Sequence, residues 1–232
     1  MKTKENGNYK FRFLNDYLLS IISECIEEGA ISKDDDLTRI KEIVYDRCSS
    51  SVDRVTFKFI HTDSIENSVK LEIKHQNYQQ AILLATTCIE HLLNDFYGQY
   101  YECVCKMSNS KINDVLKANG ISEKIGGLFL ITFNKQFPVD IEQKINLLKK
   151  KRNDFAHYKP KKIHIDSLDD SMQKDVEIQA IAKDSILVIE NLKNFLSKME
   201  DELYPENLLA KEIFEKIKAE DENNGKIENA QP

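Results

Sequence analysis

Few residues in this chain are suited to ending a helix or forming a tight turn. Its 232 residues include only 7 glycines and 4 prolines. β-Sheet domains need frequent turns, and glycine and proline are among the residues that most often form them. The shortage therefore favours helices joined by few loops, and a hydrophobic content of 41% is enough to bury a core.

Apolar residues recur at spacings of three and four along most of the chain, which is the pattern of helices that bury one face. Gly29 should end the first helix, and Gly98 should bend or end the long early one. Residues 52–60 alternate in places instead, which predicts one short extended segment. Helices are expected over residues 11–26, 37–48, 64 onward, 77–107, 110–118, 122–133, 139–155, 166–199 and 206–218.

These elements predict an all-α fold, with a four- to five-helix bundle over residues 61–204. An N-terminal helical appendage (1–60) precedes the bundle, and a short C-terminal extension (205–232) follows it. The extension combines a helix with a polar tail from Asp221, which we expect to be disordered.

Charge and cysteine content narrow the class of protein. The net charge of −6 excludes a generally basic nucleic-acid coat but leaves room for a local basic site. The cysteines number five and lack framework spacing, so we expect reduced thiols and a cytoplasmic protein. The polar first residues predict no signal peptide, and no apolar run is long enough for a membrane span.

One stretch, residues 149–162, differs from its surroundings because it holds seven basic residues and one acidic residue. A polyanion needs such a local patch on an acidic protein, since the attraction fades within about 10 Å. A second interpretation is a solvated helix end, where lysines suit the helix dipole. On the first interpretation, the basic side chains of this stretch would bind a polyanion.

The helical register singles out Arg152 within this stretch. Ile141, Ile145 and Leu148 form an apolar stripe, and the same stripe continues to Arg152 and then to Phe155. A guanidinium at a core position costs free energy unless it has a partner or an open cleft.

Asn153 and His157 fall four residues apart, in a polar line beside that stripe. A histidine that titrates near neutral pH exchanges protons, and the forked arginine side chain binds phosphate at two points. Arg152, Asn153 and His157 therefore form a minimal set for cleaving a phosphodiester without a metal or another cofactor.

The segment Arg152-Asn153-Asp154-Phe155-Ala156-His157 resembles the Arg-x(4–6)-His motif of HEPN domains, including the polar residue directly after the arginine. The segment 81–93 is similar to the early long helix of that bundle, which often carries a glutamate, here Glu90. The resemblance covers about residues 65–200.

The resemblance implies an all-α bundle that forms a homodimer and brings two Arg152/His157 motifs face to face. Many HEPN proteins are metal-independent endoribonucleases that act as toxins or phage-defence effectors, with RNA as substrate. Arg152 would then stabilise the phosphorane, His157 would transfer protons, and Asn153 would orient the phosphate. Flanking RNA phosphates would be bound by Lys151, Lys159, Lys161 and Lys162. Glu90 and Tyr158 are supporting candidates, and an antitoxin or sensor protein is a further partner.

Arg54 and His61 also match the motif spacing, but they lack the polar residue after the arginine and lie in the strand-like segment, so we reject this pair. Two other interpretations remain. A non-catalytic HEPN-like module would bind a nucleotide, RNA or a partner protein. In a purely structural alternative, a helical interaction or immunity protein, Arg152 pairs with Glu90.

Overall fold

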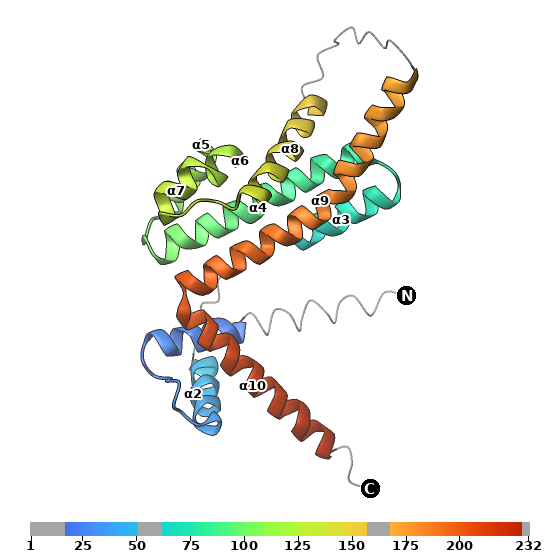
Figure 1. The fold of residues 1–232 in the computed structure, drawn as a ribbon. Helices are drawn as coiled ribbons and strands as arrows, with labels where there is room; N and C mark the ends of the chain where they lie inside the picture. Colours follow the sequence, from blue (N-terminus) through green and yellow to red (C-terminus); the bar gives the residue numbers. More distant parts are fainter. Residues whose placement is uncertain (1–16, 51–61, 157–167, 229–232) are drawn as a thin grey trace. The chain divides into compact units, whose positions relative to one another are not determined.

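The computed structural model describes residues 17–50, 62–156 and 168–228. Every regular element in these ranges is a helix, which confirms the all-α class (Figure 1). None of the helices in these ranges combines the length and the apolar character that crossing a membrane requires. The predicted extended segment, 52–60, lies outside the described residues.

The helices keep the predicted order along the chain. The first covers residues 17–27. The others are α2 (Leu37–Ser50), α3 (Thr62–Lys74), α4 (Tyr78–Cys103), α5 (Asn109–Ala118), α6 (Ile121–Ile125), α7 (Gly127–Phe133), α8 (Val139–Ala156), α9 (Leu168–Leu203) and α10 (Pro205–Glu228).

The chain divides into two compact units. The larger unit comprises residues 59–198, and the smaller unit combines residues 1–58 with residues 199–232. The N-terminal appendage and the C-terminal extension, which the sequence analysis treats as separate pieces, thus belong to one unit.

Local hydrogen bonds determine where the first helix of the smaller unit ends and where α2 begins. Gly29 ends the first helix as predicted, with φ at +72°, and the amide of Ala30 donates to the carbonyl of Cys25 at 2.8 Å. The Asp36 side chain accepts a hydrogen bond from the amide of Arg39 at 3.0 Å, which caps the start of α2.

The core of the smaller unit is shared by both ends of the chain. Its buried residues come from the first helix, the turn after it, α2 and α10. They are Ile21, Ile22, Cys25, Ile31, Ile40, Val44, Ala210, Ile213 and Phe214. Because α10 supplies part of this core, the first two helices depend on a segment that follows the whole larger unit.

The tail is a correction to the sequence analysis. Disorder is predicted from Asp221, yet α10 continues to Glu228. Composition measures whether a segment is able to bury its own core, whereas a helix already nucleated by packed residues extends at little cost. The prediction is therefore wrong for residues 221–228, and residues 229–232 lie outside the described ranges.

In the larger unit, the other helices are arranged around α4. It packs against α3, α5, α6 and α8, and the three short helices gather near its C-terminal half (Figure 1). The long helix α9 joins this group through a hydrogen bond of 2.9 Å from the Gln179 amide to the Tyr78 hydroxyl. Aromatic rings also join it, since Phe195 lies 5.0 Å from Phe137 and 5.8 Å from Phe129 between ring centroids.

Two glycines lie within the predicted helices. Gly98 does not end α4, which continues to Cys103. The single helix predicted over 122–133 is instead divided into α6 and α7 at Gly126. A Cβ atom at Gly126 would lie 2.9 Å from the carbonyl oxygen of Ser122, so the turn requires glycine there.

An ion-pair network ties α3 to α9. The Glu66 carboxylate is nearly buried and accepts hydrogen bonds from both Lys193 and Lys70, the latter at 2.6 Å. The Lys193 ammonium also lies 3.2 Å from Asp63. Burial raises the pKa of Glu66, but the two lysines outweigh it and hold the pKa below its ordinary value.

The first prediction concerns this network. Glu66→Gln should lower the free energy of unfolding by about 1 kcal/mol at neutral pH, because both lysines lose a charged acceptor. The lowered pKa means that the carboxylate contributes stability above its unfolded pKa, and that this contribution is lost as the pH falls through the folded pKa. The free energies of unfolding of the wild type and the variant, measured in urea, should therefore become equal in acid. The exposed Glu212→Gln should show no such convergence, and a pH-independent effect of Glu66→Gln would contradict the assignment.

The second prediction concerns the shared core of the smaller unit. A chain ending at Tyr204 lacks α10, so α2 and the first helix should lose their protection against amide hydrogen exchange. A chain ending at Glu220 keeps Ala210, Ile213 and Phe214, and its exchange in α2 should match that of the full chain. Hydrogen exchange followed by mass spectrometry measures this protection in both shortened chains. Unchanged protection of α2 in the shorter chain would show that the N-terminal helices fold without α10.

Candidate functional site

The candidate site is built on α8. The helix begins after Pro138, whose carbonyl accepts from the amide of Glu142 at 2.9 Å, and acidic residues in the first turn suit the helix dipole. Ile141, Ile145 and Leu148 are buried, as the apolar stripe predicts. This stripe holds α8 against α4 and sets the direction of every side chain that follows it.

Arg152 lies on the continuation of the stripe, in the last turns of α8, and is half-buried. Its Nη1 atom donates to the Oδ1 atom of Asn153 at 3.3 Å. Within the described ranges no carboxylate pairs with it. A guanidinium presents several N–H donors and is able to bind a phosphate oxygen through two of them.

The neighbouring lysines are partly engaged within the protein. Lys149 donates a hydrogen bond to the Ser122 hydroxyl of α6. Lys151 pairs with Glu177 of α9 at 2.8 Å, and this hydrogen bond lowers the pKa of the Glu177 carboxyl. To contact a phosphate, Lys151 must therefore give up Glu177. Lys150 is exposed.

The rest of the predicted site lies beyond the described part of α8. The helix ends at Ala156, so His157, Tyr158, Lys159, Lys161 and Lys162 fall in the segment outside the described residues. The rejected pair, Arg54 and His61, also falls outside them. The structure thus places Arg152 and Asn153 together and leaves their relation to His157 as a prediction.

Glu90 is half-buried on α4. The cation that it influences is Lys124, and not Arg152 as the structural alternative of the sequence analysis proposed. No ion pair joins it to Arg152 among the described residues. Its charge instead raises the pKa of Lys124, although the burial of Lys124 has the larger effect and the net pKa is lowered. The pairing of Arg152 with Glu90 in the structural alternative is therefore absent from the described part of the chain.

Sequence reasoning did not identify Lys124 as part of this region. Its side chain is fully buried, and its Nζ atom donates to the Oδ1 atom of Asn94 at 2.5 Å. The Tyr97 hydroxyl donates to the Lys124 carbonyl at 2.5 Å, which fixes α6 on α4. The sequence feature that could have indicated its burial is its position beside Ile121 and Ile125, on the apolar side of a short helical segment.

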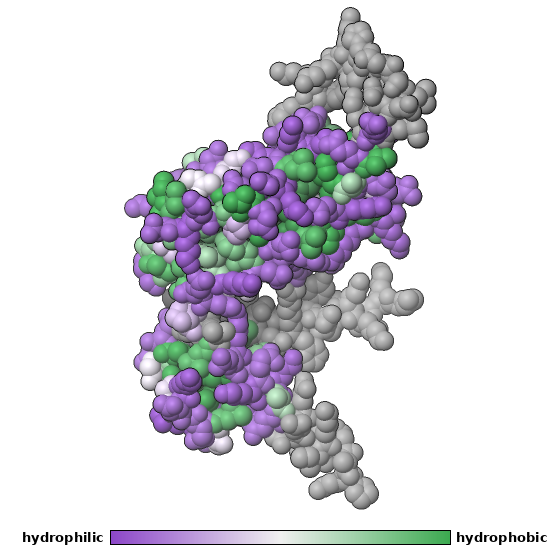
Figure 2. Space-filling model, viewed as in Figure 1, coloured by the Kyte–Doolittle hydropathy of each residue, from purple (hydrophilic) through white to green (hydrophobic). Residues whose placement is uncertain are grey.

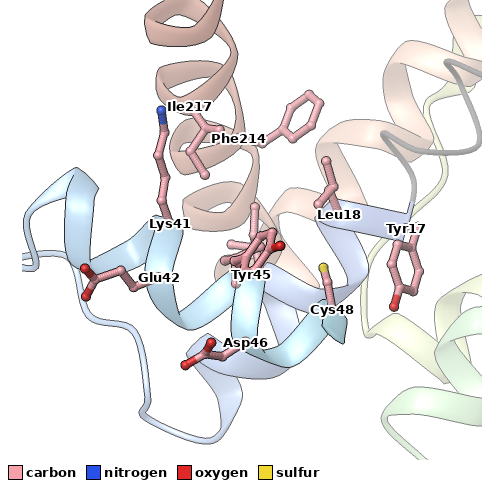
Figure 3. Close-up of a pocket in the computed structure, with 11 residues that line it drawn as sticks. Tyr17, Leu18, Lys41, Glu42, Tyr45, Asp46, Cys48, Phe214 and Ile217 are labelled. Atoms are coloured by element: carbon pink, nitrogen blue, oxygen red, sulfur yellow. The ribbon is translucent and has the colours of Figure 1, made fainter. Parts of the chain in front are cut away.

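A second concave feature lies in the smaller unit. A groove of about 810 Å³ is lined by the first helix, α2 and α10, with Leu18, Phe214 and Ile217 among its apolar residues (Figure 3). Tyr45 stands in this groove and is 74% exposed. Lys41 pairs with Glu220 at 2.8 Å and joins α2 to α10. The lining suits an apolar ligand or peptide segment, and sequence analysis did not predict it.

Comparison with known proteins finds no family model, no curated protein and no solved structure that matches the chain. Within the described ranges, no three histidine, cysteine or acidic side chains group closely enough to hold a metal ion. The candidate site therefore stands on Arg152, Asn153 and the position of α8.

The third prediction tests the buried lysine. Lys124→Met keeps the length of the side chain and removes the cost of burying an ammonium, so unfolding free energy should change by less than about 1 kcal/mol. Asn94→Leu leaves that ammonium without its acceptor and should cost about 2 kcal/mol. Urea unfolding measures both. A larger loss from Lys124→Met than from Asn94→Leu would contradict this account.

Proposed function

We propose that the chain is a metal-independent endoribonuclease of the HEPN type, acting in the cytoplasm as a toxin or phage-defence effector. The observation that supports it best is the state of Arg152. Its apolar stripe places it half-buried at the end of α8, and its only hydrogen bond to a described residue goes to neutral Asn153. By contrast, Lys144 and Lys151 on the same helix each pair with a carboxylate.

The proposed reaction is an internal transesterification of RNA. The ribose 2′-oxygen attacks the adjacent phosphorus while its proton passes to a base, and the bond from phosphorus to the 5′-oxygen breaks as that oxygen receives a proton. His157 is the proposed base or acid, with its counterpart in a second copy taking the other role. Arg152 stabilises the charge of the phosphorane, and Asn153 orients the phosphate. The products are a 2′,3′-cyclic phosphate and a 5′-hydroxyl.

Substrate contacts outside this centre involve charge more than base identity. Lys159, Lys161 and Lys162 would bind flanking phosphates, and Lys151 would join them on leaving Glu177. DNA lacks the 2′-hydroxyl and should not be cleaved.

The second candidate function is a non-catalytic module that binds RNA, a nucleotide or a partner protein. The groove of the smaller unit favours it, because a concave apolar surface with an exposed tyrosine is suited to holding a ligand or peptide. An antitoxin or sensor protein is a partner of that kind. Binding without cleavage separates this function from the nuclease.

The fourth prediction is cleavage of a mixed RNA pool in EDTA. Wild-type protein should produce cyclic-phosphate ends, and His157→Ala should lower the rate at least about a hundredfold because proton transfer is lost. Arg152→Ala should lower it by a similar factor, since the phosphorane loses its cation.

His91→Ala is the matched control, because His91 is an exposed histidine on α4. It should cleave like wild type, and circular dichroism should show that every variant is folded. Equal cleavage by wild type and His157→Ala would exclude His157 as the catalyst. A folded wild type that binds RNA without cleaving it would favour the non-catalytic module.

A further inference from the structure

The groove of the smaller unit receives apolar side chains from three helices. Leu18 comes from the first helix, Tyr45 from α2 and Phe214 from α10 (Figure 3). In the space-filling view, hydrophobic residues gather on this unit with hydrophilic residues around them (Figure 2). Tyr45 is 74% exposed within a groove of about 810 Å³. A concave apolar surface of this size, with a large aromatic side chain standing in it, is typical of a site for another molecule.

The charged residues of the lining all belong to α2. Lys41 pairs with Glu220 of α10 at 2.8 Å, so these two charges offset each other. Glu42 and Asp46 are exposed and lie about one helical turn apart, because four residues separate them. Among the described residues, the lining thus holds two further carboxylates and no second cation. A ligand with basic groups along one edge would complement it.

The walls of the groove also restrict the backbone of its ligand. An extended peptide presents unpaired amides and carbonyls, and burying them against apolar side chains costs free energy. The edge of a sheet would pair such groups, but every regular element in the described ranges is a helix. A helix pairs its own backbone groups and presents only side chains to the groove. The lining therefore favours a helical ligand over an extended one.

We propose that this groove binds an amphipathic helix of a partner protein. Apolar residues of that helix, at spacings of three and four, pack on Leu18, Tyr45 and Phe214. Lysine or arginine residues along one edge of it, spaced by four, face Glu42 and Asp46. The proposal rests on the second candidate function, a module that binds a partner, and specifies that partner. It is independent of the reaction proposed for α8.

Binding of this kind stabilises the whole smaller unit. The groove takes its lining from the first helix, α2 and α10, so a ligand in it contacts both ends of the chain at once. A ligand that binds only the packed arrangement stabilises it by mass action. Amide hydrogen exchange in α2 and α10 should therefore slow when the partner helix binds, and exchange in α4 of the larger unit should not change.

The first test identifies the chemistry of the partner without assuming its sequence. Random peptides of about 18 residues, which is about five helical turns, are displayed and selected on the full chain. Peptides that also bind Tyr45→Ala are discarded, which removes those attracted only by the net negative charge. The remaining peptides should carry apolar residues at helical spacings and a net positive charge. Enrichment of acidic or aperiodic peptides, or of none, would overturn the proposal.

The second test measures the affinity of one selected peptide by isothermal titration calorimetry. Tyr45→Ala should raise the Kd at least about tenfold, because the groove loses its exposed aromatic contact. Ile131→Ala is the matched control, since Ile131 is 84% exposed and lies on α7 of the larger unit. It should bind like wild type, and circular dichroism should show that both variants are folded. Equal Kd values for Tyr45→Ala and wild type would place the peptide elsewhere and overturn the proposal.

The same peptide tests the acidic edge. Glu42→Lys/Asp46→Lys should raise the Kd at least about tenfold, and binding should no longer weaken as salt is added. Glu212→Lys/Glu215→Lys makes the same change in net charge at exposed residues of α10 that do not line the groove, and it should bind within about twofold of wild type. Equal losses in the two double variants would show that only net charge matters, which would overturn the proposed complementarity.

A second copy of the chain is the other occupant that these variants distinguish. Sedimentation equilibrium without peptide should give the same association state for wild type and Tyr45→Ala. Self-association that Tyr45→Ala abolishes would make a second copy the occupant and overturn the proposal. The nuclease fails separately, because Tyr45→Ala should cleave RNA like wild type. Cleavage without selected peptides would overturn only the partner helix, and selected peptides without cleavage would overturn only the nuclease.

Discussion

The larger unit depends on the burial of α4. Its buried side chains are not confined to one stripe but spread over adjoining sides of the helix, and they include Ala85, Thr86, Cys88 and Leu93. A helix buried on several sides needs several partners, and α3, α5, α6 and α8 supply them. The position of α8, and with it the direction of Arg152, follows from this packing.

Several charged side chains of the larger unit have a polar partner within the same unit, and Arg152 can be compared with them. Glu66 is held by two lysines, Lys124 by Asn94, and Lys151 by Glu177. Pairing of this kind offsets the cost of removing charge from water. Arg152 differs because its hydrogen bond within the described ranges goes to a neutral amide. This difference is the observation that supports the phosphate-binding role proposed for Arg152.

The smaller unit couples the two ends of the chain through one core. Phe214 and Ile213 of α10 pack with Ile22 and Ile40 of the N-terminal helices, so neither end forms this core alone. The residues that line the groove beside this core have no role in the reaction proposed for α8. The chain therefore carries the proposed catalytic residues on one unit and an apolar groove on the other.

Local patterns in the sequence were sufficient for most of the helices, because apolar spacing, Gly29 and the aspartates before α2 act over a few residues. They also placed Arg152 at the end of the apolar stripe of α8, since register along one helix needs no knowledge of its neighbours. Only the tertiary structure decided which distant side chains meet: Lys124 with Asn94, Lys151 with Glu177, and α10 with the first helix. Those contacts join residues far apart in the sequence, and short-range periodicity carries no information about them. The break at Gly126 belongs to the same class, because a close backbone approach, and not local propensity, separates α6 from α7.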